Sequence, residues 1–98
     1  MYRLLFFHTV NEFLASLPDT VQAKIRVNAR TMQSGNFQSV YVKTLRGPIR
    51  ELIVKEYRVL FFIKHNVICF VHAFQKKAAK TPLAEIERAM RVYKMMKD

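Results

Sequence analysis

The sequence contains one cysteine, Cys69, among its 98 residues, so no disulfide bond can form within the chain. Cys69 lies in the apolar run Val67–Val71, which predicts a core strand and a reducing compartment. No apolar run approaches the ~20 residues that a membrane-spanning helix needs, and the N-terminal run is too short for the core of a secretion signal. We therefore expect a cytoplasmic protein that does not enter membranes.

Glycine and proline are also scarce, with two and three residues respectively. A chain with 51% apolar residues and so few breaks is expected to fold rather than remain disordered. Its length is sufficient for one core and too short for two, so residues 1–98 are expected to form a single domain. The small size also leaves little room for a deep pocket, so no small-molecule cofactor is expected.

Several kinds of catalytic site are excluded by what the sequence lacks. The three histidines and Cys69 lie at no spacing typical of metal ligands, so no metal site is expected. The two glycines are isolated, which excludes a glycine-rich phosphate loop, and no serine lies in a G-x-S-x-G motif. The few acidic side chains form no convincing carboxylate pair for acid-base hydrolysis.

Acidic residues are few in comparison with basic ones. Seven Asp and Glu against seventeen Lys and Arg give a net charge of +10. Most of this excess lies in residues 43–98, and residues 57–84 contain no acidic residue at all. Such an excess indicates a polyanionic or strongly acidic partner that binds the second half of the chain.

Two helices, the first of them short, are predicted in the first part of the chain from apolar residues spaced three and four apart. The first has Thr9 as its expected N-cap and ends before Pro18, and the second opens at Asp19 or Thr20. Gly35 is expected at the C′ position of the second helix, and the pair should form a hairpin. Their apolar faces contain Val10, Phe13, Leu14 and Leu17, and Val21, Ile25, Ala29 and Met32.

Five segments rich in β-branched and aromatic residues are predicted to be strands. Residues 46–48, Arg-Gly-Pro, provide a turn, and residues 64–66, Lys-His-Asn, join the last two strands as a hairpin. Because those two strands are apolar on both faces, helices are expected to cover much of the sheet. The expected strands are residues 2–7, 40–45, 51–55, 57–63 and 67–74.

A third helix is predicted after the last strand, with Thr81 as N-cap, Pro82 at its first position and Glu85 in its first turn. The element order β-α-α-β-β-β-α predicts an α+β fold. In this fold a mostly antiparallel sheet packs on an N-terminal helix hairpin and carries a C-terminal helix. The apolar face of the third helix is expected to contain Leu83, Ile86, Met90, Tyr93 and Met96 or Lys97.

A basic cluster is attached to the predicted sheet. Arg58 lies on one strand, and strand alternation places it on the same face as Leu60 and Phe62, so it needs a partner such as Glu51 or an anionic ligand. The lysines of the cluster follow the next strand. Either Arg58 forms a structural ion pair and the lysines are ordinary surface charges, or the cluster binds phosphate. The lysines are Lys76, Lys77 and Lys80.

Five segments of the second half form a recognisable set. They are residues 43–47, 50–54, 57–62, 72–77 and 80–86, and the pattern F-x-K-K-x-x-K-T-P-x-x-E-I after the Y-R-V strand is the most specific part. Together they resemble the RelE/HigB-type toxin superfamily, in its phage-derived HigB-like branch, over residues 10–95.

The resemblance implies the small RelE-like fold and the toxin of a type II toxin-antitoxin system. Members of this superfamily commonly cleave messenger RNA, often on the ribosome, with Arg and Lys side chains and no metal. The implied partners are a cognate antitoxin, messenger RNA and the ribosome with its rRNA. From the surplus positive charge, the antitoxin is expected to present an acidic or mixed segment near Arg58 and Lys77, with Met90, Met95 and Met96 as adaptable apolar contacts.

The resemblance also suggests roles for individual residues. Arg58 is expected to contact the scissile phosphate as a two-pronged donor. Lys77 and Lys80 are the next candidates for contacting the scissile phosphate. Lys76 either shares that role or binds the RNA backbone elsewhere. His72 is either a proton carrier or a structural side chain, and Tyr93 either a catalytic or a core residue. Expected RNA contacts, each equally explicable as a surface charge, are Lys43, Arg46 and Arg50, with Arg88, Arg91 and Lys94 in the C-terminal helix.

Two features depart from the family pattern. Ile53 stands where relatives usually have an arginine, and only residues 54–56 separate it from Tyr57, where relatives often have a longer hairpin. Three alternatives stay open: a non-enzymatic toxin of a related fold that binds and inhibits DNA gyrase, an inactive RNA-binding relative, and a DNA-binding regulator suggested by the helix pair around Leu17 and Pro18. The last is disfavoured because the second helix presents no recognition-like polar surface.

Overall fold

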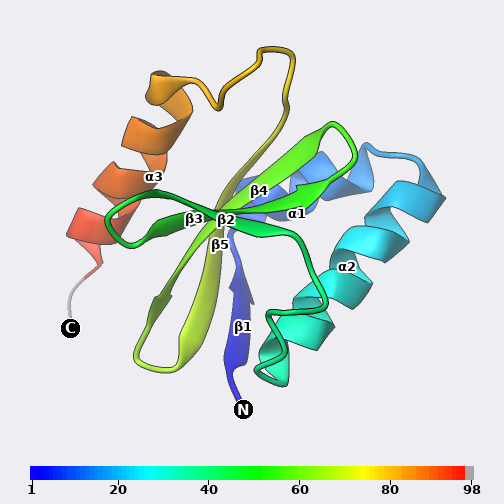
Figure 1. Ribbon diagram of the computed structural model, residues 1–98, viewed down its shortest axis with the longest axis horizontal. Helices are drawn as coiled ribbons and strands as arrows, with labels where there is room; N and C mark the ends of the chain where they lie inside the picture. The colour runs from blue at the N-terminus through cyan, green and yellow to red at the C-terminus, as the bar shows by residue number, and fades with distance from the viewer. Residues whose placement is uncertain (97–98) are drawn as a thin grey trace.

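A five-stranded sheet in the order β1-β5-β4-β3-β2 forms the centre of the protein (Figure 1). The structure is a computed structural model and describes residues 1–96. The strands are β1 (Arg3–Phe6), β2 (Val42–Arg46), β3 (Ile49–Val54), β4 (Tyr57–Lys64) and β5 (Val67–Gln75), and the helices are α1 (His8–Ala15), α2 (Asp19–Gln33) and α3 (Leu83–Met95). The expected α+β fold and element order are confirmed.

The sheet is mostly antiparallel, as expected. β2, β3, β4 and β5 form consecutive antiparallel pairs, whereas β1 lies parallel to β5 with Arg3 opposite Val67. The β4–β5 hairpin turns at His65 and Asn66, whose φ angles of 52° and 65° lie in the left-handed region required by its tight turn. The predicted turn is therefore present.

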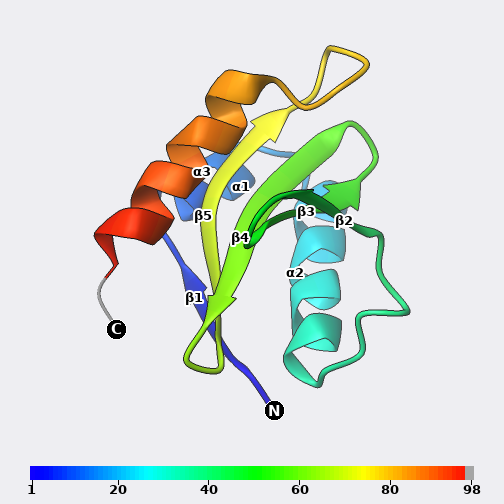
Figure 2. The same cartoon turned by 60° about the vertical axis from the view of Figure 1, so that its left-hand side comes forward.

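Helices cover both faces of the sheet, so the sheet is the middle of three layers (Figure 2). The hairpin of α1 and α2 packs on one face, where Phe61 and Phe70 are fully buried, and α3 packs on the other, where Leu60 and Phe62 are fully buried. Each such side chain contributes about 2 kcal/mol by leaving water. The prediction that the last two strands need cover on both faces is confirmed.

Cys69 lies on β5 and is buried against the α3 side of the sheet. Burial raises the pKa of its thiol, and the nearby charge of Lys64 opposes that shift. The thiol is therefore a core group, as its apolar sequence context predicts.

Two predicted helix caps are wrong. α1 begins at His8 with Phe7 as its N-cap, because the Phe7 N–H still donates to Phe70 O in the sheet and the helix starts directly afterwards. Thr9 consequently lies inside the helix. Pro82 rather than Thr81 is the N-cap residue of α3, and Thr81 uses its hydroxyl elsewhere.

Other boundaries differ slightly. α2 begins at Asp19, and Gly35 has a φ of 89° after the C-cap residue, both as predicted. The strands predicted at residues 40–45 and 51–55 are residues 42–46 and 49–54. On α3, Leu83 is 53% exposed and not a core residue, whereas Ala89, which the prediction omitted, is fully buried between the helix and the sheet. Lys97 lies outside the described residues.

Candidate functional site

One end of the α3-side face carries most of the polar side chains of the sheet interior. Strand register places Glu51 on β3 opposite Leu60 on β4, and Leu60 opposite His72 on β5. Two pairs further along, and so on the same face again, Arg58 lies between Ile53 and Phe74. Residues directly opposite one another share a face, so Glu51, Arg58 and His72 all project to the side of α3.

Glu51 is the only polar or charged residue that is fully buried among residues 1–96, with 1% of its surface exposed. Its Oε1 lies 3.7 Å from Nε of Arg58, whose side chain is 13% exposed. A buried carboxylate costs several kcal/mol unless it is paired. The ion pair that the sequence suggested for Arg58 is therefore present.

The Arg58 guanidinium is held by further contacts. Nη1 donates to the backbone oxygens of Lys55 at 2.7 Å and of Tyr57 at 3.0 Å. Nε is buried and, within residues 1–96, makes no hydrogen bond of acceptable geometry. Nη2 is thus the nitrogen best placed to meet a ligand, and a two-pronged contact would require Arg58 to give up some of these partners.

The loop between β5 and α3, residues 76–82, carries the predicted lysines. Thr81 Oγ1 donates to Glu51 Oε1 at 2.6 Å, and the Lys76 N–H donates to Glu56 O at 2.7 Å. These two bonds fix the ends of the loop at the end of the sheet where β4 begins, and Figure 1 shows the loop projecting from that end. Lys77 and Lys80 are exposed on it.

His72 forms a second polar pair beside the first. Its Nε2 lies 2.8 Å from Oε1 of Glu85 in the first turn of α3, and its ring stacks on Phe74 with centroids 5.6 Å apart. The side chains of His72 and Glu85 are 17% and 24% exposed. His72 also lines a groove of about 380 Å³ between α1 and α3. The pair joins β5 to α3 and remains within reach of solvent.

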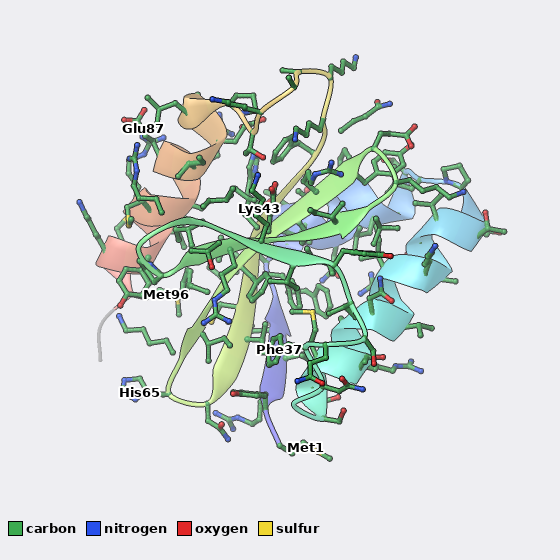
Figure 3. All side chains as sticks on the ribbon, in the orientation of Figure 1. Met1, Phe37, Lys43, His65, Glu87 and Met96 are labelled. Atoms are coloured by element: carbon green, nitrogen blue, oxygen red, sulfur yellow. The ribbon has the colours of Figure 1, made fainter. Side chains whose placement is uncertain are left out.

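The predicted RNA contacts are divided between the two faces. Lys43 lies opposite Glu51 and therefore on the α3 side; Figure 3 labels it near the centre of the view, in front of the sheet. Arg50 lies opposite Phe61, on the side of α1 and α2. The structure does not bring Arg50 to the Arg58 site.

Tyr93 lies at the other end of the sheet. Its ring packs edge-on against Phe62 with centroids 4.9 Å apart, and Lys64 Nζ lies 4.6 Å from its centroid. Phe62 is four residues beyond Arg58 on β4, a separation of about 13 Å along the strand. Of the two roles considered for Tyr93, core packing is the one that this position supports.

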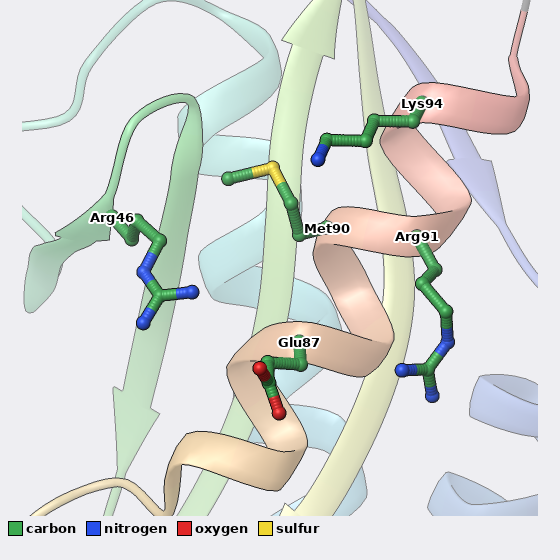
Figure 4. A pocket seen from close by; sticks show the side chains of 5 residues that line it. All are labelled: Arg46, Glu87, Met90, Arg91 and Lys94. Atoms are coloured by element: carbon green, nitrogen blue, oxygen red, sulfur yellow. The ribbon is translucent and has the colours of Figure 1, made fainter.

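Arg46 lies in a separate basic crevice between the β2–β3 turn and α3. Figure 4 shows Arg46 facing Glu87 and Met90 across this space, with Lys94 reaching toward Met90. The crevice has a volume of about 180 Å³ and is also lined by Arg91. It brings together three of the cations that the sequence suggested as RNA contacts.

The sequence interpretation missed two polar groups of the site. The sequence predicts Glu85 only as an acidic residue of a helix N-terminus, and Thr81 only as the cap of that helix. A threonine preceding proline gives no signal of a long-range partner, because its acceptor, Glu51, lies 30 residues away. Thr81 thereby joins the loop to the carboxylate that pairs with Arg58, and Glu85 joins α3 to His72 on β5.

No group of three or more metal-ligating side chains is present in residues 1–96. Within the same range, no helix has the length and apolar character to cross a membrane.

The chain was compared with models of protein families. The model described as phage-derived protein Gp49-like (DUF891) matches residues 12–94. Among curated proteins, none is similar enough in sequence to match the chain.

Three solved structures share the fold. In the RelE–RelB complex from Pyrococcus horikoshii OT3 the similar chain is 20% identical, with a TM-score of 0.67, and the match covers 80% of this chain and 98% of that one. In the RelB–RelE antitoxin-toxin complex from Methanococcus jannaschii the similar chain is 17% identical, with a TM-score of 0.64, and the match covers 72% of this chain and 88% of that one. The isolated RelE toxin from E. coli is 15% identical, with a TM-score of 0.63, and the match covers 94% of this chain and 99% of that one.

Proposed function

Since the chain belongs to the phage-derived Gp49-like family and has the RelE fold, as its sequence motifs predicted, we propose that it is the toxin of a type II toxin-antitoxin pair. Its activity would be that of an endoribonuclease that cleaves messenger RNA during translation, without a metal ion. Such a target would place the protein in the cytoplasm.

The observation that carries this proposal is the position of Arg58. Its guanidinium lies on the sheet face beside an anchored loop that carries Lys76, Lys77 and Lys80, in a chain of net charge +10. A concentration of cations around one partly buried arginine attracts polyanions and gives the bound phosphate a defined position.

The chemistry needed is modest. The RNA 2′-oxygen attacks the adjacent phosphorus and loses its proton, a new oxygen–phosphorus bond forms, and the bond to the 5′-oxygen breaks as that oxygen gains a proton. Arg58 and the loop lysines would stabilise charge on the phosphorane-like transition state. His72 and the lysines remain the candidates for moving the two protons.

A cognate antitoxin is the second part of the proposal. Two of the structural neighbours were solved as RelB–RelE complexes. For this chain we expect an acidic or mixed antitoxin segment that lies across Arg58 and Lys77. Of the methionines suggested as apolar contacts, Met95 is 78% exposed, whereas Met90 and Met96 pack partly into the core.

One observation favours the non-enzymatic alternative. Arg58 already binds Glu51 and two backbone oxygens, and this is the state expected of a structural ion pair. A toxin that acts by binding DNA gyrase would not need a free arginine at this position.

The test is induced expression in a bacterial host, with growth measured and messenger RNA ends mapped by primer extension. The variants are Arg58→Ala and, as a matched control, Arg30→Ala, which removes an exposed arginine from α2 on the far side of the sheet. We expect wild type and the control to arrest growth with new cuts at translated codons. Arg58→Ala should fold, judged by circular dichroism of the purified protein, and should cut at least ~10-fold less.

Other results would change the assignment. Growth arrest without new RNA ends would overturn the nuclease and favour gyrase inhibition, and equal cutting by Arg58→Ala would remove Arg58 from the site. No arrest by wild type would indicate the inactive relative, with Ile53 in place of the usual arginine as the first residue to change.

A further inference from the structure

Tyr41 is a large aromatic side chain that is 79% exposed. It directly precedes β2, and its backbone oxygen accepts a hydrogen bond of 2.9 Å from the Ile53 N–H. Tyr41 therefore continues the β2–β3 ladder by one residue and has a fixed backbone position. An aromatic ring that is fixed in this way and left in solvent has a face on which another ring can stack.

The direction of the Tyr41 side chain follows from its neighbours. Val42 packs into the core formed with α1 and α2. Successive side chains of an extended segment point to opposite faces, so Tyr41 and Lys43 point to the α3 side. Lys43 lies opposite Glu51, whose carboxylate pairs with Arg58 on that same side, which confirms the assignment.

Tyr41 and Arg58 consequently belong to one row across the sheet. Tyr41 lies beside Ile53, and Ile53 lies opposite Arg58. Neighbouring strands are about 4.8 Å apart, so the backbones of Tyr41 and Arg58 are separated by about 10 Å. We call the surface formed by Tyr41, Lys43, Ile53 and Arg58 the shelf. Its charged side chains that reach solvent are both cations, since Glu51 is buried beneath them.

We propose that Tyr41 binds RNA by stacking on a nucleobase next to the phosphate that Arg58 contacts, with Lys43, in the neighbouring row of the same face, binding the adjacent backbone. The inference rests on the proposed function, because it identifies where the single-stranded substrate lies. Proteins usually hold single-stranded nucleic acid with exposed aromatic rings beside cations. Every base has a flat face that can stack on such a ring, and every phosphodiester carries a negative charge that attracts the cations.

The experiment uses the absence of tryptophan from the chain. Tyr41→Trp introduces one fluorophore on the shelf, and Val27→Trp introduces one at a position on α2 that is 57% exposed and lies on the other side of the sheet. The probe is a short single-stranded RNA with 2′-O-methyl groups, which binds but cannot be cleaved. Tyr41→Ala and Tyr41→Phe are compared with wild type for affinity and, in cells, for messenger RNA cutting.

We expect the RNA to quench the fluorescence of the Tyr41→Trp variant and to leave that of the Val27→Trp variant unchanged. Tyr41→Ala should weaken RNA binding and reduce cutting roughly 10-fold, as loss of one stacked base does. Tyr41→Phe should retain both, because the ring and not the hydroxyl makes the contact.

Two results would overturn the proposal in distinguishable ways. If wild type cuts RNA while Tyr41→Ala cuts equally well and the Tyr41→Trp fluorescence does not respond to RNA, the stacking site is wrong and the proposed function stands. If wild type neither binds nor cuts RNA, both fail. In that case, quenching of the Tyr41→Trp variant by a purified antitoxin would assign the shelf to a protein partner instead.

Discussion

The hydroxyl of Thr81 donates a 2.6 Å hydrogen bond to the same carboxylate oxygen of Glu51 that lies 3.7 Å from Nε of Arg58. One buried acidic group therefore serves both parts of the candidate site: it neutralises the arginine of the sheet and anchors the loop that carries the lysines. The relative position of Arg58 and the lysines depends on Glu51, although no ligand needs to touch it.

The first prediction concerns this anchor. Thr81→Val keeps the shape of the side chain and removes the donor. We expect it to lower the free energy of unfolding by about 1–2 kcal/mol, because a buried carboxylate loses a hydrogen bond. RNA cutting should fall by more than this loss of stability alone would cause, because the loop that carries the lysines is no longer held to Glu51. Urea denaturation and primer extension measure the two effects.

Thr81→Ser is the matched control, because it retains the hydroxyl and should retain both stability and cutting. Full cutting by Thr81→Val with its loop intact would show that the backbone bond from Lys76 to Glu56 alone positions the lysines.

The second prediction concerns the ion pair. Glu51→Gln can still accept the Thr81 hydrogen bond but no longer offsets the charge of Arg58. We expect a loss of about 2 kcal/mol in the free energy of unfolding at neutral pH, because a nearly buried guanidinium loses its counter-charge. Glu56→Gln, an exposed change on the β3–β4 turn, should stay within about 0.5 kcal/mol. In an Arg58→Met background, Glu51→Gln should hardly lower the free energy of unfolding any further. If it lowers it there by the same amount as in wild type, Arg58 and Glu51 are not coupled.

Most of the fold is predictable from the sequence because its signals are local. Apolar residues spaced three and four apart mark α2, and β-branched and aromatic runs mark β4 and β5. The errors occurred where tertiary contacts override local preference. Phe7 remains paired with Phe70 in the sheet and so moves the start of α1, and Ala89 rather than Leu83 meets the sheet because a small residue lets the helix approach closely.

The site is less predictable than the fold. Strand alternation was sufficient to place Arg58 on an apolar face and to suggest Glu51 as its partner. Thr81 and Glu85 were missed because their partners, Glu51 and His72, lie on strands distant in sequence, and no local pattern encodes such pairs. Tyr41 was missed because a single exposed aromatic next to a strand has no signature until the register shows what lies beside it.

The third prediction concerns the pair that joins β5 to α3. His72→Phe keeps a ring to stack on Phe74 and removes the contact with Glu85. We expect the fold to persist while backbone hydrogen exchange in the first turn of α3 becomes several-fold faster than in its last turns, because local opening is governed by local contacts. Glu87→Gln, exposed on the same helix, should leave exchange unchanged. Uniform acceleration along α3 would instead indicate that His72 supports the whole helix.

The fourth prediction concerns pH and follows from Cys69. Burial raises the pKa of this thiol above its ordinary value of 9.0, with an opposing effect of Lys64. Between that value and the higher folded pKa, the unfolded chain releases a proton that the folded chain retains. Ionisation of the thiol therefore favours the unfolded state. The contribution of Cys69 to the free energy of unfolding is fully present below pH 9.0 and decreases as the pH rises above it.

Cys69→Ala isolates this contribution from the tyrosines and lysines that also titrate at alkaline pH. The variant is expected to be less stable than wild type at pH 7 by about 1–2 kcal/mol, because a buried sulfur is lost. The variant has no thiol to ionise, so only wild type loses stability in this way. The difference in the free energy of unfolding between the two proteins, here called the gap, should therefore narrow by up to about 1 kcal/mol per pH unit above 9.0. Urea denaturation of both proteins from about pH 7 to about pH 10.5 measures the gap directly. A constant gap would mean that Cys69 has the same pKa in the folded and unfolded states, so that Lys64 or solvent cancels the effect of burial.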